Sequence, residues 1–587
     1  MIAGKRRCSI SNSVMSSGNM RSLRYRKKSL TGSACSIWLY AAFLLIIAVK
    51  AVLASRLYIL VNGYAYHDDM LGICQAQSLI QGNWLGTYHA RTLVKGIAFP
   101  VFLASNSYTG IPYTVSITVL YGIACVLLCK ALKPALKKDV FLLLTFIVLF
   151  FNPANGNTSS FLRIYRNSLS PVLLLMVIAA FIEIYYSRGK WLWLTAVWAG
   201  IWLALFINNR EDSFWIYPFV ITATILSAVK LLSENRKNGK KTGLVLLAFV
   251  IPFLIVFLVN TGIKAENKKY YGVPYRNELS EGGFPELMKA LYSIAPEEDL
   301  YRVSVTRSTV EHVREVSPTF AEVSSALDGY YGIWDPYDGS EDGQICDGWF
   351  FWCLRESIYD SYPDLSAEEI SGKCAQMAKE IKNEQAAGNL PVRGGIVMPS
   401  ALMSPYKKGY AKELCFEFLR LFRSAVSFSR SDNFERYRIG EPETFRMLEE
   451  MTSATVDPSD GSDTGSRKLA YAVYEKVNRV YILFGDGTFA VALICWCAML
   501  VFLFRRKHGF PQTADAVLFA FGFIASAAVY LLGASYTHIS AFSTDNVGYL
   551  SAVYPLFSAF CCVSIFGLLN EILTRRKQSE RGNDGTV

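Results

Sequence analysis

The apolar stretch "SIWLYAAFLLIIAVKAVLASRLYILV", from Ser36 to Val61, decides the fold of this 587-residue chain. It is too long to be the core of a signal peptide, and it is long enough to cross a bilayer. The segment before it is basic and contains Arg21, Arg24, Arg26, Lys27 and Lys28. Because positive charge stays on the cytoplasmic side of a membrane, we interpret residues 36–61 as a signal anchor and residues 1–35 as a basic cytoplasmic tail.

The composition is that of a membrane protein with several spans. Hydrophobic residues make up 52% of the chain and charged residues 18%, which is below the share of about 25% that is usual in soluble domains. The net charge of +11 does not indicate nucleic-acid binding, because Lys and Arg gather at the chain ends and between apolar runs, where topology signals lie. We therefore predict no nucleic-acid partner.

Nine further apolar runs predict an all-α polytopic membrane protein with about ten transmembrane helices. The runs lie at about 113–132, 140–151, 169–186, 191–207, 214–232, 243–262, 480–504, 514–532 and 549–573. If each run crosses once, five basic segments fall inside: "KALKPALKKD", "YYSRGKW", "KLLSENRKNGKK", "FRRKHGF" and "TRRKQSERGND". This alternation satisfies the positive-inside rule, so both termini are predicted to be cytoplasmic.

The runs divide the chain into regions. Residues 36–262 form a membrane module of about seven spans with a first outside loop at 62–112; then come an extracytoplasmic soluble domain at 263–479, three spans at 480–573 and a cytoplasmic tail at 574–587. Segments such as "DLSAEEISGKCAQMAKEIKNEQ" have helical apolar spacing, so we expect this insert to be mainly helical.

Two patterns in the insert need a separate interpretation. The acidic segment "DPYDGSEDGQICDG" lacks the alternating ligands and the terminal Glu of a calcium loop, so we interpret it as a turn. The sequence allows a disulfide in this extracytoplasmic region, but it does not give the pairing. The cysteines concerned are Cys346, Cys353, Cys374 and Cys415.

The first outside loop carries the strongest candidate site. His67, Asp68 and Asp69 are consecutive at its start, and apolar residues from Met70 to Ile80 recur at helical spacing, which predicts a helix along the membrane surface. The later segment "NWLGTYHARTLVKG" adds the cations Arg91 and Lys95. Helix capping would account for one carboxylate. Two adjacent carboxylates beside a histidine favour a functional site.

Other outside loops also carry charge. "NTSSFLRIYRNSLSP" contains Arg163 and Arg166, "NNREDSFW" contains Arg210, Glu211 and Asp212, and "THISAFSTDNVGY" contains His538 and Asp545. Snorkelling toward lipid headgroups explains the first pair of arginines equally well, and a solvated turn explains the second loop. Carboxylates that accept a proton and cations that hold a phosphate are together what group transfer from a lipid-linked phosphate requires.

This arrangement resembles the GT-C superfamily of membrane glycosyltransferases, which includes protein O-mannosyltransferases and the aminoarabinose transferases of bacterial lipid A. In that superfamily an acidic motif follows the first span, within a first outside loop that contains surface helices, and a seven-span module follows. The loop "HDDMLGICQAQSLIQGNWLGTYHARTLVKGIAFPVFLA" also looks like that of a group of bacterial multi-pass membrane proteins with a D-D...G-x-W-L-G-x-Y...T-L-x-K-G...P pattern. The resemblance implies a GT-C-like bundle with Asp68 and Asp69 as catalytic residues.

We therefore predict an inverting, GT-C-like membrane glycosyltransferase that acts on the outer side of the cytoplasmic membrane. An Asp is the general base, and Arg or Lys holds the phosphate of a polyprenyl-phosphate sugar. The acceptor is an envelope glycan, lipid or protein. We predict no cofactor and no metal, although the resemblance allows a divalent metal, for which Glu211 and Asp212 are the candidate ligands. The predicted substrate-binding residues are His67, Arg91, Lys95, Arg163, Arg166, Arg210, Glu211 and Asp212.

Two other functions stay open on the sequence. A lipid or glycan transporter, or flippase, predicts charged or broken helices near the bilayer midplane, and most of the apolar runs lack charges there, with Lys50 and Glu183 as exceptions near run ends. A non-catalytic scaffold or receptor with an extracellular binding domain predicts that Asp68 and Asp69 tolerate replacement by Asn.

Overall fold

The computed structural model describes residues 36–234, 239–334, 343–346, 348–394, 403–432, 436–458, 463, 465–505 and 511–583. Within these ranges helices dominate, and the strands β1 (Val61–Asn62) and β2 (Arg438–Ile439) form a short parallel pair. The predicted tail at 1–35 and most of the acidic segment at 335–348 lie outside the described residues. The prediction of an all-α chain is confirmed.

Ten apolar helices lie at the ten predicted positions, which confirms a polytopic membrane protein. Eight of them are long and apolar enough to cross a membrane: α2 (Ile37–Ala54), α5 (Tyr113–Leu136), α8 (Lys190–Ile207), α9 (Tyr217–Glu234), α10 (Gly239–Tyr271), α18 (Gly465–Arg505), α19 (Pro511–Ser540) and α21 (Tyr554–Asn583). The other two, α6 (Asp139–Phe150) and α7 (Ser170–Tyr186), are shorter. A helix satisfies its own backbone groups, as the interior of a bilayer demands.

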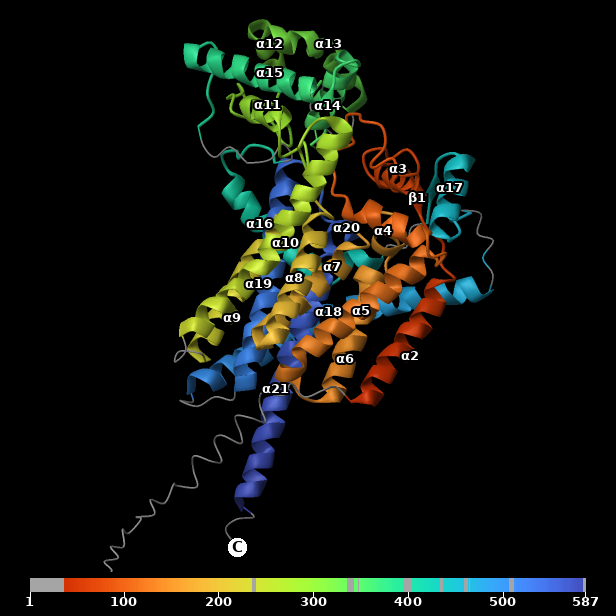
Figure 1. Cartoon of the computed structure of the whole chain (residues 1–587), viewed down its shortest axis with the longest axis vertical. Helices are drawn as coiled ribbons and strands as arrows, with labels where there is room; N and C mark the ends of the chain where they lie inside the picture. The colour runs from red at the N-terminus through yellow and green to blue at the C-terminus, as the bar shows by residue number, and fades with distance from the viewer. Residues whose placement is uncertain are drawn as a thin grey trace, which may run out of the picture.

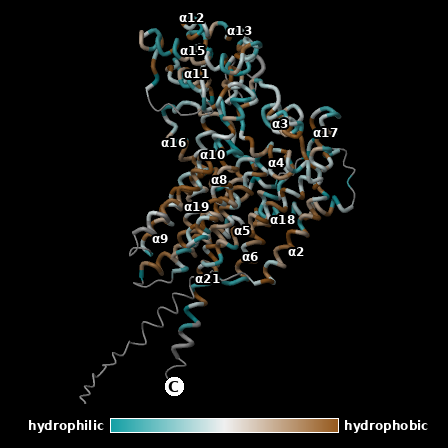
Figure 2. Tube along the Cα trace, viewed as in Figure 1, coloured by the Kyte–Doolittle hydropathy of each residue, from teal (hydrophilic) through white to brown (hydrophobic). Residues whose placement is uncertain are grey.

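The apolar helices form a tilted bundle that is brown in Figure 2, below a more hydrophilic layer. In Figure 1 the helices α11–α15 lie at the upper end of the bundle, and the end of α21 lies at the lower end. The helix α7 is buried along most of its length and packs against α5 and α8. Its uniformly apolar sequence fits that position, because a helix that is apolar on all sides belongs inside a bundle.

The upper layer has a hydrophobic core of its own. It contains α11 (Gly283–Tyr292), α12 (Arg307–Val316), α13 (Pro318–Trp334), α14 (Phe350–Ser361) and α15 (Ala367–Ala387). The helix α15 begins with a capping box in which Ser366 and Glu369 bond reciprocally, and it ends at Gly388 with φ +85°. No disulfide joins any two of the cysteines Cys346, Cys353, Cys374 and Cys415.

The later part of the predicted insert joins the membrane bundle instead. The helices α16 (Tyr410–Val426) and α17 (Pro442–Thr452) contribute Leu421 and Leu448 to the core that the spans share. The strand β2 pairs with β1, directly after the first span. The described part of the insert is mainly helical, as predicted, but it consists of a separate layer at 273–394 and a second segment at 403–463 that folds back onto the bundle.

The first outside loop contains α3 (Asp69–Ile80) and α4 (Ala98–Ser107), which pack against each other. The helix α3 lies at the predicted place, directly after the histidine and the first aspartate. It buries Met70, Leu71 and Ile73 and ends just before Gly82, which has φ +78°. The two helices therefore hold the start of the loop firmly on the bundle.

Candidate functional site

Asp68 and Asp69 lie where the chain enters α3, but their side chains have different surroundings. Asp68 occupies the position that precedes the helix and makes no capping hydrogen bond with its side chain. The interpretation of this carboxylate as a helix cap is therefore wrong. The Asp69 side chain is fully buried, whereas that of Asp68 is 46% exposed.

Asp69 is held by Arg163, from the loop between α6 and α7. Arg163 Nε donates to both carboxylate oxygens of Asp69 at 2.8 and 3.1 Å, and the Asn62 N–H donates to Oδ2 at 3.3 Å. Burial raises the pKa of Asp69 above its ordinary value, and Arg163 opposes that rise. This ion pair ties the loop after α2 to the loop between α6 and α7, and the Asp69 side chain has no exposed surface.

Asp68 faces the cations. The Lys95 ammonium forms an ion pair with it, the Tyr165 hydroxyl donates to Asp68 Oδ1 at 2.9 Å, and Arg163 Nη2 lies 3.9 Å from Oδ2. Loss of solvent works to raise the pKa of Asp68, but Lys95, Arg166 and Arg163 together hold it well below its usual range. Asp68 is thus an ionised carboxylate that solvent, and so a substrate, can reach.

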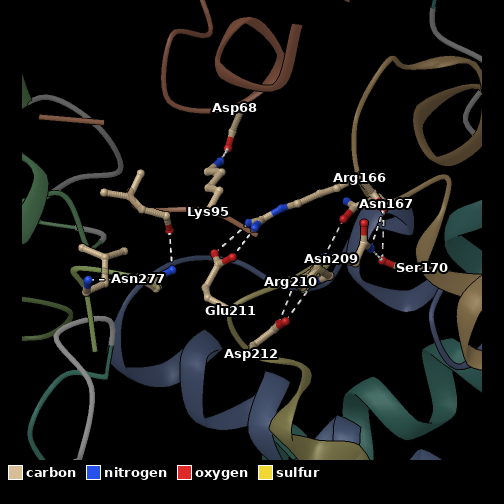
Figure 3. Close-up of polar contacts among 12 residues, drawn as sticks. Asp68, Lys95, Arg166, Asn167, Ser170, Asn209, Arg210, Glu211, Asp212 and Asn277 are labelled. Carbon is tan, nitrogen blue, oxygen red and sulfur yellow. Dashed lines mark hydrogen bonds and ion pairs between the residues drawn. The ribbon is translucent and has the colours of Figure 1, made fainter. Parts of the chain in front are cut away.

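A polar network continues from Asp68 through Lys95, Arg166 and Glu211 (Figure 3), and the Tyr165 hydroxyl also belongs to it. Arg166 donates to both oxygens of Glu211, at 2.7 Å from Nη2 to Oε1, and its Nε donates to the Tyr165 hydroxyl at 3.1 Å. Lys95 Nζ lies 3.3 Å from the same hydroxyl. Burial and the Arg166 charge lower the pKa of Lys95 to about 8. The two buried cations, Lys95 and Arg166, therefore lie among the carboxylates of Asp68 and Glu211.

Arg210 and Asp212 form a neighbouring pair. The Arg210 guanidinium donates to both oxygens of Asp212 at 2.9 and 2.7 Å and to Asn167 Oδ1 at 2.5 Å, and it lies 5.5 Å from the centre of the Tyr549 ring. Burial works to raise the pKa of Asp212, but Arg210 lowers it below its ordinary value. Arg210 is only 11% exposed, so this loop is not a solvated turn.

The arginines of the loop between α6 and α7 do not extend toward lipid headgroups. Arg166 is 9% exposed and binds Glu211, and Arg163 binds Asp69. The snorkelling interpretation is therefore wrong for both side chains.

His67 and Arg91 point elsewhere, toward α14 of the upper layer. His67 Nε2 lies 3.2 Å from Glu356 Oε1, and Arg91 Nε lies 3.5 Å from the same oxygen. The structure thus divides the ten predicted residues among four groups. These are Asp69 with Arg163; Asp68 with Lys95, Arg166 and Glu211; Arg210 with Asp212; and His67 with Arg91 against the upper layer.

Sequence reasoning missed two residues at the site. Tyr165 lies between the two arginines of its loop, and that position was the signal that could have revealed it. Glu356 lies in an ordinary amphipathic helix with no such signal. Among the described residues, no three His, Cys, Asp or Glu side chains converge as a metal site requires.

Two apolar grooves lie between the spans. One of about 170 Å³ lies between α7, α9 and α19, and its lining includes Trp215, close along the chain to Asp212. The other, of about 490 Å³, lies between α6, α18 and α21, and its lining includes Phe428 and Tyr481. Trp215, three residues after Asp212, is therefore the part of the first groove that is nearest along the chain to the charged loop at 210–212.

Comparison with known proteins leaves the family open. No protein-family model matches the chain, and no curated protein matches it. Among solved structures, the chain is similar to the crystal structure of ArnT from Cupriavidus metallidurans bound to undecaprenyl phosphate, with 10% sequence identity and a TM-score of 0.29. The alignment covers 91% of this chain and 77% of ArnT. A likeness at this level decides neither the fold nor the function.

Proposed function

We propose that the chain is a membrane glycosyltransferase that moves a sugar from a polyprenyl-phosphate donor to a cell-envelope acceptor on the outer side of the cytoplasmic membrane. The observation that carries the proposal is Asp68, an ionised and half-exposed carboxylate beside the cations Lys95 and Arg166. Proton removal and phosphate stabilisation need these two kinds of group close together.

The proposed reaction is a direct displacement. The acceptor oxygen bonds to the anomeric carbon of the sugar while the bond from that carbon to the phosphate oxygen breaks, and the acceptor proton passes to Asp68. The departing phosphate gains negative charge, which Lys95 and Arg166 stabilise. Arg166 uses three of its five N–H donors on Tyr165 and Glu211, which leaves two for the phosphate. Displacement from the opposite face inverts the anomeric configuration.

We assign the polyprenyl chain of the donor to the groove between α7, α9 and α19. Its lining is almost wholly apolar and includes Phe181, Phe219 and Phe519. Trp215 at this groove follows the charged loop closely, so a chain bound there brings its phosphate toward Arg210 and the Asp68 network. An apolar groove with charged groups at one end suits an amphiphile with a phosphate head.

The two span charges that the sequence singled out do not favour a transporter. Lys50 is buried near the end of α2 and donates to the carbonyl oxygens of Phe150, at 2.5 Å, and Asn155, at 2.9 Å, so it secures the end of α6. Glu183 pairs with Lys130 at 2.9 Å. Both charges bind fixed partners within the protein, which is a structural role.

The experiment that tests the proposal is mass spectrometry of envelope glycans. Cells that lack the protein are compared with cells complemented by the wild type, by Asp68→Asn, or by Asp364→Asn, an exposed carboxylate in the upper layer, at matched expression. We expect one sugar substituent to vanish without the protein and to return with the wild type and Asp364→Asn but not with Asp68→Asn. An unchanged profile in cells without the protein would refute the proposal.

A further inference from the structure

The upper layer reaches the acidic pair through α14. Next to Asp68, the His67 ring lies edge-on to Trp352 with the ring centres 4.6 Å apart, and the Trp349 ring is 6.3 Å away. Glu356, one helical turn after Trp352, lies 3.2 Å from His67 and 3.5 Å from Arg91. Two tryptophans and a carboxylate of the upper layer thus face the residue that precedes Asp68.

These polar groups are close but leave bonding capacity unused. His67 Nε2 and Glu356 Oε1 lie 3.2 Å apart, and Arg91 Nε lies 3.5 Å from the same Glu356 oxygen, so an imidazole and a guanidinium share one carboxylate oxygen. The side chains of His67, Arg91 and Glu356 are 25%, 28% and 18% exposed. The second carboxylate oxygen of Glu356 and the Nη groups of Arg91 have no hydrogen-bond partner among the described residues, so they can bond a ligand that supplies hydroxyl groups.

The start of α14 also touches the last outside loop. A Cβ at Gly348 would lie 3.3 Å from the Phe542 ring, and Phe542 packs against Tyr549 with the ring centres 5.8 Å apart. Tyr549 in turn covers Arg210. The upper layer therefore lies over the proposed site from the first outside loop to the last, in contact with both.

We propose that His67, Arg91, Trp352 and Glu356 form the binding site for the acceptor, and that the acceptor is a carbohydrate. This inference rests on the proposed function. Asp68 then lies between two sets of residues, with Lys95 and Arg166 on the donor phosphate and the α14 residues on the acceptor. The α14 residues bind and orient the acceptor, and the proton still passes to Asp68.

The chemistry of this cluster favours a sugar over a lipid. Indole rings offer an apolar face with a polar edge, and the carboxylate, guanidinium and imidazole offer hydrogen bonds in several directions, as a ring that carries hydroxyl groups requires. A lipid acceptor needs an apolar groove beside these residues, and both large grooves described above lie between spans, away from α14. A protein acceptor is one outcome of the test below.

Steady-state transfer by the full-length protein in lipid nanodiscs tests the inference. The donor is the lipid extract and the acceptor is the unmodified envelope glycan, both from cells that lack the protein. The variants are Trp352→Ala, Trp352→Phe and Glu356→Gln. The controls are Tyr301→Ala and Glu368→Gln, which replace an exposed tyrosine and an exposed glutamate of the same layer.

We expect Trp352→Ala and Glu356→Gln to raise the KM for the glycan about tenfold, as loss of one good contact would. The KM for the donor and kcat at saturating glycan stay within about twofold, and Trp352→Phe and both controls behave like the wild type. Glycan binding can also be measured without turnover. The Asp68→Asn variant should bind the glycan with a change in tryptophan fluorescence, and the addition of Glu356→Gln to that variant should weaken this binding.

Three results would overturn the inference: a glycan KM unchanged in both variants, a fall in kcat alone, or equal effects of Trp352→Phe and Trp352→Ala. Transfer to envelope proteins with no transfer to glycan would also overturn it while leaving the proposed function intact. No transfer by the wild-type protein would overturn the proposed function itself, and this inference with it.

Discussion

At the scale of single residues, two adjacent carboxylates have different roles. Asp69 begins α3, so its side chain turns inward to Arg163, whereas Asp68 precedes the helix and remains accessible beside Lys95. The sequence indicated the pair, but it did not show which carboxylate is accessible. That depends on Arg163 and Tyr165, which come from a different loop.

Replacement of Asp69 by Asn should destabilise the protein, because it leaves the partly buried Arg163 without its carboxylate. A broken buried ion pair costs about 3–5 kcal/mol, and the 27% exposure of Arg163 places the expected loss toward the lower end. Thermal unfolding in detergent measures the effect, with Asp364→Asn as the exposed control. Equal unfolding temperatures for Asp69→Asn and the wild type would contradict the structural role.

Lys95 should make donor binding dependent on pH. Its pKa is lowered to about 8, so its charge is present at pH 7 and mostly lost at pH 9. The affinity for a polyprenyl phosphate should therefore fall about tenfold between these values, as loss of one charged contact would give. Arginine stays protonated, so Lys95→Arg should remove the difference. Titration of both proteins with a polyprenyl phosphate at pH 7 and pH 9 measures these affinities. An equal fall in affinity for Lys95→Arg would contradict the assignment of Lys95 to the phosphate.

At the scale of elements, the loop that contains Gly96 and the loop between α8 and α9 pack closely against each other at that glycine. A Cβ on Gly96 would lie 2.2 Å from the carbonyl oxygen of Asn208, and the N–H of Ala98 donates to that same oxygen at 2.9 Å. This contact places Lys95 beside the loop that carries Glu211. Hydropathy patterns in the sequence do not reveal it, because it joins two short segments without periodicity.

Gly96→Ala should therefore displace one loop and impair the site. The overlap is with backbone, so the neighbour cannot rotate away, and we expect a loss of stability above about 2 kcal/mol together with loss of transfer. Gly372→Ala is the matched control, since its Cβ meets no atom within 4 Å and it lies within α15. Measurements of the free energy of unfolding and of the transfer rate for both variants test this prediction. A Gly96→Ala variant with the stability and transfer rate of the wild type would contradict it.

The sequence predicts the positions of the apolar helices well, but it does not predict all of their ends. The apolar runs locate ten helices because hydropathy is what a bilayer selects. The helix α10 continues through a polar end to Tyr271, and α18 begins at Gly465, well before its apolar part. Polar turns that extend an apolar helix leave no hydropathy signal, so the sequence does not give those ends.

At the scale of the whole molecule, the positions of the basic loops define an orientation. The end of α21 lies at one end of the bundle, and α11–α15 lie at the other (Figure 1). The connection between α7 and α8 lies beside the end of α9, because Arg188 pairs with Glu234. The positive-inside rule then predicts that the upper layer lies outside the cell. The division of the insert into two parts was not predictable, because it depends on contacts between residues far apart in the chain.

Substituted cysteines test this orientation. After the exposed native Cys74, Cys415 and Cys497 are replaced by Ser, a cysteine at Glu368 should react with a membrane-impermeant maleimide in intact cells. A cysteine at Arg188, between α7 and α8, should react only after the cells are permeabilised. The reverse pattern would contradict the proposed orientation.

The central claim is that transfer depends on Asp68, and the most direct measurement is the initial rate of transfer by purified Asp68→Asn in nanodiscs. Asn keeps the shape of the side chain but is a far weaker base, so the rate per folded protein should fall by at least about 100-fold. The rate is measured well below the unfolding temperature of the variant, because Asp68→Asn also removes the ion pair with Lys95. A rate within about twofold of the wild type would contradict the account, because the carboxylate beside Lys95 would then have no part in the chemistry.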